Sequence, residues 1–170
     1  MSAPTQADVW QWLDAVMDPE VPVVSVVDLG IVREIAVQDD VVDVVLTPTY
    51  SGCPATEVIA NDITQALQQH GLKVNISTRI APPWTSDWLS AKGREALRAY
   101  GIAPPVHLAE FSDATQHTRV VQLHRSKLSV PCPLCGASDT RVLSQYGSTA
   151  CKALYRCNSC LEPFDYFKPH

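Results

Sequence analysis

The sequence has no long apolar run and no excess of positive charge. Nowhere do about 18 apolar residues stand together, the length that a membrane-spanning helix requires, so we expect no membrane partner. Its 13 Lys and Arg residues are outnumbered by 18 Asp and Glu residues, for a formal net charge of -5. Because phosphate backbones favour clustered basic side chains, this balance also argues against nucleic acid as a partner.

A secretory signal is also missing from the start of the sequence. The first residues, MSAPTQADVW, show no basic segment, no continuous apolar stretch and no small-residue cleavage site. We therefore expect a cytoplasmic protein, in a compartment where thiols stay reduced. In that setting the six cysteines are better explained as metal ligands or free thiols than as disulfides.

The composition is that of a folded chain with one ordinary domain and a small appendage. Hydrophobic residues make up 46% and charged residues 18% of the 170 residues, close to average usage in globular proteins. The acidic excess is confined to residues 1–100, which hold 13 acids against 6 bases. We infer that these residues form one compositional unit.

Hydrophobic periodicity predicts the order helix, strand, strand, helix, strand along this acidic part. The predicted fold class is α+β, a small sandwich with helices on one face of a mixed three-stranded sheet. The expected elements, in order, are a helix from Ala7 to Met17, strands over residues 31–37 and 41–46, a helix from Pro54 to His70, a strand over residues 73–80, and a short helix capped by Ser86 or Ser90.

Proline and composition predict where this fold ends. The tripeptide Ala103-Pro104-Pro105 closes it, which gives a first domain of residues 1–105. Residues 106–129 have little core of their own, so we expect a linker with one strand over residues 119–123. Residues 130–170 are expected to form a second, smaller β domain.

Two Cys-x-x-Cys pairs lie in this last segment, with 21 residues, 136–156, between them. Each pair can turn two sulfurs toward one cation, and two pairs make a tetrahedral four-sulfur site. The intervening residues 141–143 and 153–155 suit two strands that bring the pairs together, as in a zinc ribbon. The predicted metal ligands are Cys132, Cys135, Cys157 and Cys160.

Zinc is the expected metal, and its expected role is structural, because so short a segment rarely folds without a metal ion. Iron also suits four sulfurs, as in rubredoxin-like centres, so the spacing leaves both metals open. The site offers no free position for a catalytic water. Cys151 lies between the pairs and is expected to be a buried thiol rather than a fifth ligand.

Cys53 lies in the polar loop TPTYSGCPA, residues 47–55. With Pro54 as the first helical residue, Cys53 is predicted to be the N-cap of the second helix, where unpaired N–H groups favour a thiolate. The alternative is a small capping residue that packs as a weak hydrophobe. No histidine lies in the loop, and His70 is at the far end of the helix, so we do not expect a cysteine-dependent enzyme.

Three acidic residues, Asp18, Glu20 and Asp28, belong to the loop between the first helix and the first strand. Their carboxylates could reach the end of the sheet where Cys53 lies. They could equally be turn formers, because Asp before Pro and Asp before Leu-Gly are ordinary turn chemistry. The residues alone leave both interpretations open.

Three segments of the chain together resemble one family. They are DPEVPVVSVVDLGIV at residues 18–32, TPTYSGCPA at residues 47–55, and the pairs CPLCG and CNSC within residues 132–160. The chain resembles the PaaD family, an accessory subunit of the bacterial phenylacetyl-CoA 1,2-epoxidase system. Its N-terminal part is similar to SufT-like iron-sulfur assembly domains. The likeness covers nearly the whole chain, including PPWTSDW at residues 82–88.

This resemblance implies a non-catalytic accessory or maturation factor in aerobic phenylacetate degradation. It implies that Cys53 transiently binds an iron-sulfur cluster for the reductase or oxygenase subunit of the epoxidase. Asp18, Glu20 and Asp28 would be its acidic neighbours. One cysteine cannot complete a cluster's coordination, so a homodimer, a partner or exogenous thiols must supply the rest. The alternative is a structural or electron-transfer subunit of the epoxidase whose four-sulfur site carries iron.

Overall fold

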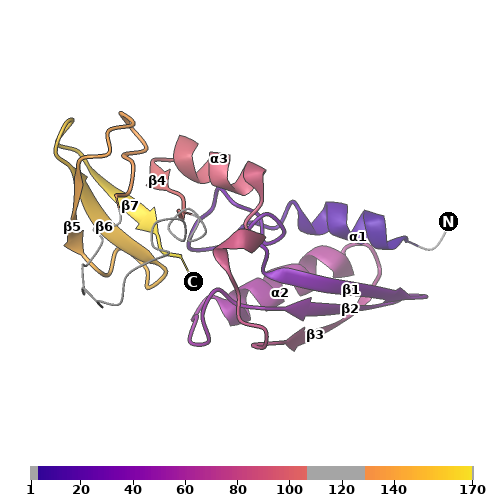
Figure 1. Ribbon diagram of the computed structural model, residues 1–170. Helices are drawn as coiled ribbons and strands as arrows, with labels where there is room; N and C mark the ends of the chain where they lie inside the picture. Colours follow the sequence, from indigo (N-terminus) through magenta and orange to yellow (C-terminus); the bar gives the residue numbers. More distant parts are fainter. Residues whose placement is uncertain (1–3, 107–128, 170) are drawn as a thin grey trace, which may run out of the picture. The chain divides into compact units, whose positions relative to one another are not determined.

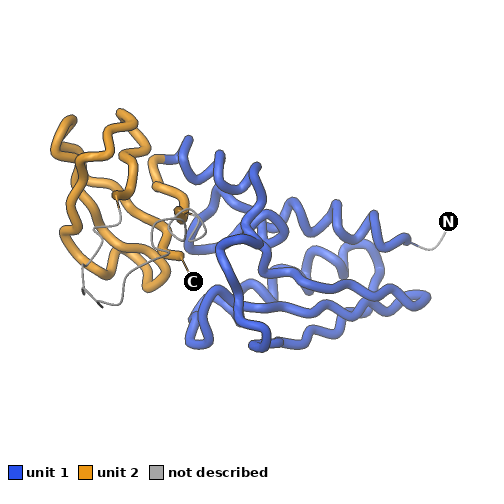
Figure 2. Tube along the Cα trace, in the orientation of Figure 1, with its two compact units in different colours: residues 1–100, 170 blue, residues 101–169 orange. Residues whose placement is uncertain are grey.

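The computed structural model describes residues 4–106 and 129–169 of the chain (Figure 1). The chain divides into two compact units, residues 1–100 with residue 170, and residues 101–169 (Figure 2). Among the described residues, no helix has both the length and the apolar character needed to cross a membrane.

The first unit is the α+β sandwich that the hydrophobic periodicity predicts. Its sheet has the strand order β1-β2-β3, with β1 antiparallel and β3 parallel to β2 (Figure 1). Helices α1 and α2 contact each other, and they pack on β1 and β3 respectively. The elements are α1 (Gln6–Leu13), β1 (Val32–Gln38), β2 (Val41–Leu46), α2 (Thr56–Gln68), β3 (Lys73–Thr78), a 3-10 turn η1 (Ser86–Trp88) and α3 (Ala91–Ala99).

Alternation of apolar side chains on β2 explains why helices cover one face of the sheet. Val42, Val44 and Leu46 are fully buried, whereas the residues between them are partly exposed. Side chains of a strand alternate between the two faces, so the three buried residues share the face on which the helices pack. The buried side chains Ile59 and Ile63 of α2 belong to the same apolar core.

Helix α1 ends earlier than its apolar pattern predicts. The sequence favours a helix to Met17, but the last helical residue is Leu13. Beyond it the backbone N–H of Val16 bonds to the Leu13 carbonyl, a tighter i to i-3 turn, and Met17 forms an isolated antiparallel bridge with Ser25. The apolar residues after Leu13 therefore follow a turn that brings the chain back toward residue 25.

The segment after β3 packs over the turn at residues 28–30. The Trp84 Nε1–H donates to the Leu29 carbonyl at 2.9 Å. Gly30 has a φ of +74°, and a Cβ atom there would stand 2.6 Å from the Trp88 carbonyl oxygen, so only glycine fits. Of the two predicted helix caps, Ser90 is the N-cap of α3 and accepts from the Gly93 N–H.

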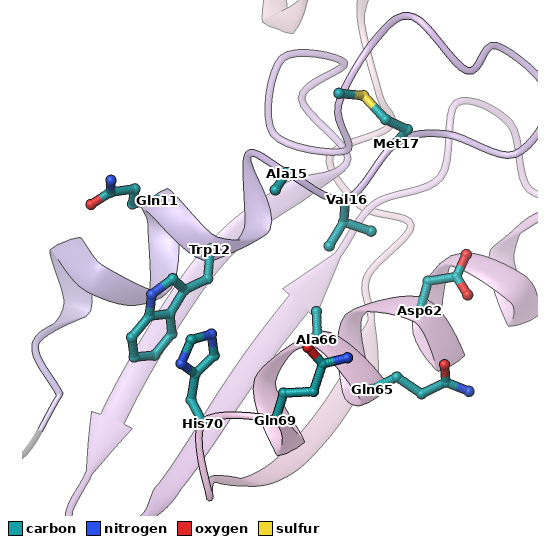
Figure 3. Close-up of a pocket in the computed structure, with 10 residues that line it drawn as sticks. All are labelled: Gln11, Trp12, Ala15, Val16, Met17, Asp62, Gln65, Ala66, Gln69 and His70. Carbon is teal, nitrogen blue, oxygen red and sulfur yellow. The ribbon is translucent and has the colours of Figure 1, made fainter.

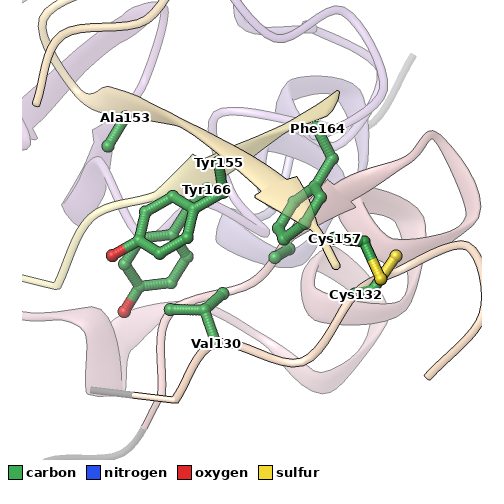
Figure 4. Packing of buried hydrophobic residues seen from close by; sticks show 8 residues of the cluster. Val130, Cys132, Ala153, Tyr155, Cys157, Phe164 and Tyr166 are labelled. Carbon is green, nitrogen blue, oxygen red and sulfur yellow. The ribbon is translucent and has the colours of Figure 1, made fainter. Parts of the chain in front are cut away.

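The second unit is a four-stranded sheet in the order β4-β7-β6-β5, with a small apolar core (Figure 4). Two of the predicted metal ligands, Cys132 and Cys157, belong to that core. The tyrosines Tyr155 and Tyr166 pack edge to face within it, with ring centroids 5.3 Å apart. The strands are β4 (Ile102–Ala103), β5 (Thr140–Ser144), β6 (Lys152–Cys157) and β7 (Pro163–Phe167).

The division between the units falls earlier than the proline-rich boundary at residue 105. Strand β4, residues 102–103, pairs in parallel with β7 and therefore belongs to the second unit. The positions of prolines cannot predict this pairing, because β4 pairs with residues more than 60 positions away in the sequence. Of the expected linker 106–129, residues 107–128, with the expected strand over 119–123, lie outside the described residues.

Candidate metal and sulfur sites

Four cysteine sulfurs of the second unit converge on one point. The Sγ atoms of Cys132, Cys135, Cys157 and Cys160 all lie within 4.8 Å of one another. The Sγ atoms of Cys132 and Cys160 are 3.8 Å apart, and those of Cys135 and Cys157 are 3.5 Å apart. Sulfurs placed tetrahedrally about 2.3 Å from a zinc ion are roughly 3.8 Å from each other. The donor set and its spacing therefore fit a tetrahedral metal ion.

Backbone turns and strand pairing explain how the sequence assembles this site. In the first pair the Gly136 N–H donates to the Cys132 carbonyl at 2.9 Å, and Gly136 takes a φ of +75°. In the second pair the N–H groups of Ser159 and Cys160 both point at the Cys157 sulfur, each at 3.4 Å. The antiparallel ladder between β5 and β6 then brings the two turns together.

The sulfurs influence each other's protonation strongly. The backbone N–H of Cys160, with that of Ser159, lowers the pKa of Cys157 to about 6. The Glu162 N–H acts to lower the pKa of Cys160, but burial and the neighbouring sulfurs outweigh it and raise this pKa to about 12. Such close sulfurs can all ionise only around a cation, so metal binding at this site would release protons.

The four sulfurs of this candidate metal site differ in exposure. Cys132 and Cys157 are buried, Cys160 is half-buried and Cys135 is exposed. Four protein sulfurs leave no position for a catalytic water, which indicates a structural role. Cys151 is buried, as predicted, and its sulfur lies 3.0 Å from the Thr149 hydroxyl, outside the four-sulfur group.

Cys53 is not at the N-cap of α2, so this prediction was wrong. Helix α2 begins at Thr56, and its N-cap is Ala55. The Thr56 hydroxyl and backbone N–H both bond back to the Cys53 carbonyl, at 2.9 and 3.3 Å, and close a turn before the helix starts. Cys53 therefore lies two residues before the N-cap, in the turn that leads into α2.

The expected stabilisation of a Cys53 thiolate is also wrong. Burial raises the pKa of this half-buried thiol, and the Ala55 N–H lowers it only in part. The negative charges of Glu20 and Asp18 raise it further, because they disfavour a second anion nearby. The surroundings of Cys53 therefore favour its protonated form, and a cation beside it would favour ionisation.

The three predicted acidic neighbours divide into two groups. Asp18 and Glu20 act electrostatically on Cys53, and the Asp18 carboxylate also accepts the backbone N–H groups of Glu20 and Val21, both at 2.8 Å. Asp18 is thus both a turn former and a charged neighbour. Asp28 instead contacts the start of α3.

Asp28 is the centre of a polar network that fixes α3. Its carboxylate accepts the Ser90 hydroxyl at 2.6 Å and pairs with Lys92 at 2.9 Å. Burial acts to raise the pKa of Asp28, but the bonds from Ser90, Lys92 and Ser25 outweigh it and lower the pKa. Sequence reasoning missed this role, although the cap signal at Ser90 pointed to the right helix.

A groove between α1 and α2 was also missed by sequence reasoning. It encloses about 510 Å³, and at one end the rings of Trp12 and His70 stack with centroids 3.7 Å apart (Figure 3). No local sequence pattern indicated this pair, because its two rings come from different helical segments. His70 lies just beyond the last residue of α2, at the opposite end of that helix from Cys53.

Comparison with known protein families gives a match for each unit. Residues 6–78 match the family described as iron-sulfur cluster assembly protein. Residues 116–168 match the family described as PaaD zinc beta ribbon domain. The two matches agree with the α+β sandwich and with the four-sulfur ribbon.

Individual relatives extend these matches. A protein of Escherichia coli (strain K12), named provisionally as one of the subunits of 1,2-phenylacetyl-CoA epoxidase, is 42% identical over 168 residues, 98% of this chain and 94% of its own length. An Fe-S protein maturation auxiliary factor of Porphyromonas gingivalis (strain ATCC BAA-308 / W83) is 36% identical over 101 residues, 58% of this chain and 92% of its own. The crystal structure of a domain of unknown function, DUF59, from Bacillus anthracis covers 54% of this chain and 90% of its own, with 27% identity and a TM-score of 0.50.

Proposed function

Because this chain belongs to the PaaD family, we propose that it is a non-catalytic accessory factor of a phenylacetyl-CoA 1,2-epoxidase. Its task is to assist iron-sulfur cluster assembly in, or delivery to, the reductase or oxygenase subunit. The cluster is cargo in this proposal rather than a resident cofactor. Similarity along 98% of the chain to a protein named as an epoxidase subunit, together with the iron-sulfur assembly match, supports this role.

The observation that carries the proposal is the chemistry around Cys53. A half-buried thiol lies within the fields of Glu20 and Asp18, whose negative charges raise its pKa and would also attract a bound cation. An arriving iron-sulfur species binds the Cys53 sulfur as the thiol proton leaves to solvent. When a ligand of the client replaces this sulfur on the cluster, reprotonation of Cys53 favours release. This is the behaviour expected of a transient ligand.

The incomplete ligand set at Cys53 requires a second source of ligands. One sulfur cannot saturate a cluster, which uses four protein ligands in the common types. We propose that the client subunit, a second copy of this chain or an exogenous thiol supplies the others. Shared coordination of this kind suits transfer, because ligands can be exchanged one at a time.

The ribbon has a different task in this proposal, namely to hold its own fold around a structural zinc. Zinc bound to Cys132, Cys135, Cys157 and Cys160 supplies folding energy and no redox chemistry. Metal analysis of the aerobically purified chain separates this from electron transfer. We expect one zinc per chain and no visible absorbance, whereas a coloured one-iron centre would support the electron-transfer subunit and contradict the assembly role.

The delivery role is tested with Cys53→Ala in a host that grows on phenylacetate. We expect the variant chain to stay folded while the epoxidase reductase is recovered with a depleted cluster and growth on phenylacetate slows. Ser51→Ala, an exposed change in the same loop, is the matched control and should leave cluster occupancy normal. Full cluster occupancy and normal growth in the Cys53→Ala strain would exclude delivery through this cysteine.

A further inference from the structure

Two arginines face each other across neighbouring strands of the ribbon. In the antiparallel register of β5 and β6, Arg141 is directly opposite Arg156. Tyr155 and Cys157, on either side of Arg156, are buried in the core, so the arginine pair lies on the opposite face of the sheet. Arg141 is exposed and Arg156 is half-buried.

No carboxylate of the described residues forms an ion pair with either arginine. Elsewhere in the described residues, basic side chains are usually paired with acids, and the bases so paired are Lys73, Arg79, Lys92, Arg98 and Lys152. Like charges placed directly opposite on a sheet repel and destabilise it. The arginine pair is therefore a local excess of positive charge on a chain whose net charge is -5.

The guanidinium of Arg156 is already oriented by the protein. Its Nε–H donates to the Leu161 carbonyl at 3.0 Å, and its terminal N–H groups have no other acceptor among the described residues. Restricting the side chain beforehand lowers the entropy that a bound partner would otherwise cost. A guanidinium held in this way suits a carboxylate, which accepts two parallel hydrogen bonds from one guanidinium.

Apolar side chains lie close to the arginine pair in sequence and along the strands. Leu143 is 47% exposed and Leu161 is 59% exposed, and Pro163, opposite Arg156 on β7, is exposed as well. Arginine with exposed apolar groups is typical of protein interfaces, where lysine is depleted. The surface therefore combines charge for recognition with apolar area for affinity.

We propose that the arginine pair, Arg141 with Arg156, is a docking site for an acidic, extended segment of a partner protein. Carboxylates of that segment bind the two guanidiniums, and its apolar side chains cover Leu143 and Leu161. Nucleic acid suits this surface less well, because a polyphosphate needs a longer row of bases. The proposal rests on the ribbon alone and is independent of any role of Cys53.

The test is a binding titration of the full-length, zinc-loaded chain. The probe is a short fluorescein-labelled peptide of alternating Glu and Val, followed by fluorescence anisotropy at low and high salt. We expect saturable binding that the double variant Arg141→Gln with Arg156→Gln weakens by about tenfold, with a shallower salt dependence. Lys168→Gln, an ordinary basic residue of the same unit, is the control and should bind as the original chain does.

The folded state of the double variant is checked by zinc content and far-UV circular dichroism, so that a loss of binding is not mistaken for a loss of structure. Equal affinity of the variant and the original chain, or no binding of the acidic peptide at all, overturns the proposal. Tighter binding of a single-stranded oligonucleotide than of the peptide also overturns it, in favour of a nucleic-acid surface.

Discussion

The two units of this chain keep their cysteine sulfurs in opposite surroundings. In the ribbon, backbone N–H groups point at Cys157 and lower its pKa, and three other sulfurs complete the ligand set. In the α+β unit, burial and two carboxylates raise the pKa of Cys53, which has no second cysteine of its own unit beside it. In the function that we propose, this difference separates a permanent metal site in one unit from an exchangeable ligand in the other.

The same contrast extends to what holds each unit together. In the described part of the ribbon unit, eight buried residues form one apolar cluster, and two of them are candidate metal ligands. The α+β unit instead has helices packed on an apolar sheet face, with valine, leucine and isoleucine side chains fully buried. We expect the first fold to depend on an ion and the second on packing.

Removing one ribbon ligand should have the largest effect. Cys132→Ser leaves three sulfurs, and loss of the metal should cost the ribbon on the order of 10 kcal/mol of folding free energy, enough to unfold it. Zinc stoichiometry and limited proteolysis of the second unit measure this. Cys151→Ser, at a buried cysteine outside the four-sulfur group, should keep its zinc. A Cys132→Ser chain that keeps its full zinc content and a protease-resistant ribbon would contradict the expectation that the ribbon fold depends on a metal ion.

A backbone change in the α+β unit should come next in size. Gly30→Ala meets both a φ of +74° and a contact of 2.6 Å with the Trp88 carbonyl, so we expect the free energy of unfolding to fall by about 2–4 kcal/mol. Gly71→Ala has a φ of +79° with nothing within 4 Å, and should lose only about 1 kcal/mol. Urea denaturation followed by tryptophan fluorescence compares the two. Equal losses of unfolding free energy in the two variants, or loss of zinc from either one, would contradict the expectation that the two units are stabilised independently.

The smallest expected effect concerns the reactivity of Cys53. Glu20→Gln removes a negative charge that raises the pKa of this thiol, so more thiolate should be present at any pH below that pKa. Iodoacetamide should then alkylate Cys53 roughly threefold faster at neutral pH, as measured by mass spectrometry of its peptide. In the unsubstituted chain the rate should keep rising with pH past 9.0, the usual value for the thiol, because burial raises the pKa. Glu95→Gln on α3 is the control, and an unchanged alkylation rate in Glu20→Gln would contradict the electrostatic account.

Local patterns predicted most of the fold and the whole four-sulfur set. The strand β2 was predicted to its terminal residues, Val41 and Leu46, because β-branched runs and turns are local signals. The Cys-x-x-Cys spacing predicted that the four sulfurs converge, because a single turn places both sulfurs of each pair. These features depend on neighbours in the sequence.

Most of the features that the sequence did not predict depend on distant residues. The direction of the pKa change at Cys53 reflects burial and charges that lie more than 30 residues earlier in the chain. The role of Asp28 in holding Ser90 and Lys92 spans more than 60 positions. The N-cap prediction failed because of a local contact. Thr56 bonds back to the Cys53 carbonyl, so the N-cap of α2 is two residues later than predicted, at Ala55.

The parallel pairing of β3 with β2 explains why a loop that contains Cys53 follows β2. Two antiparallel strands can be joined by a tight hairpin, as β1 and β2 are, with two residues between them. A parallel neighbour requires the chain to cross from one end of the sheet to the other, and α2 makes that crossing. The residues from Thr47 to Ala55 are the bend at the carboxyl edge of β2, where α/β units commonly bind their ligands. Strand direction alone thus places the cysteine at the rim of the sheet.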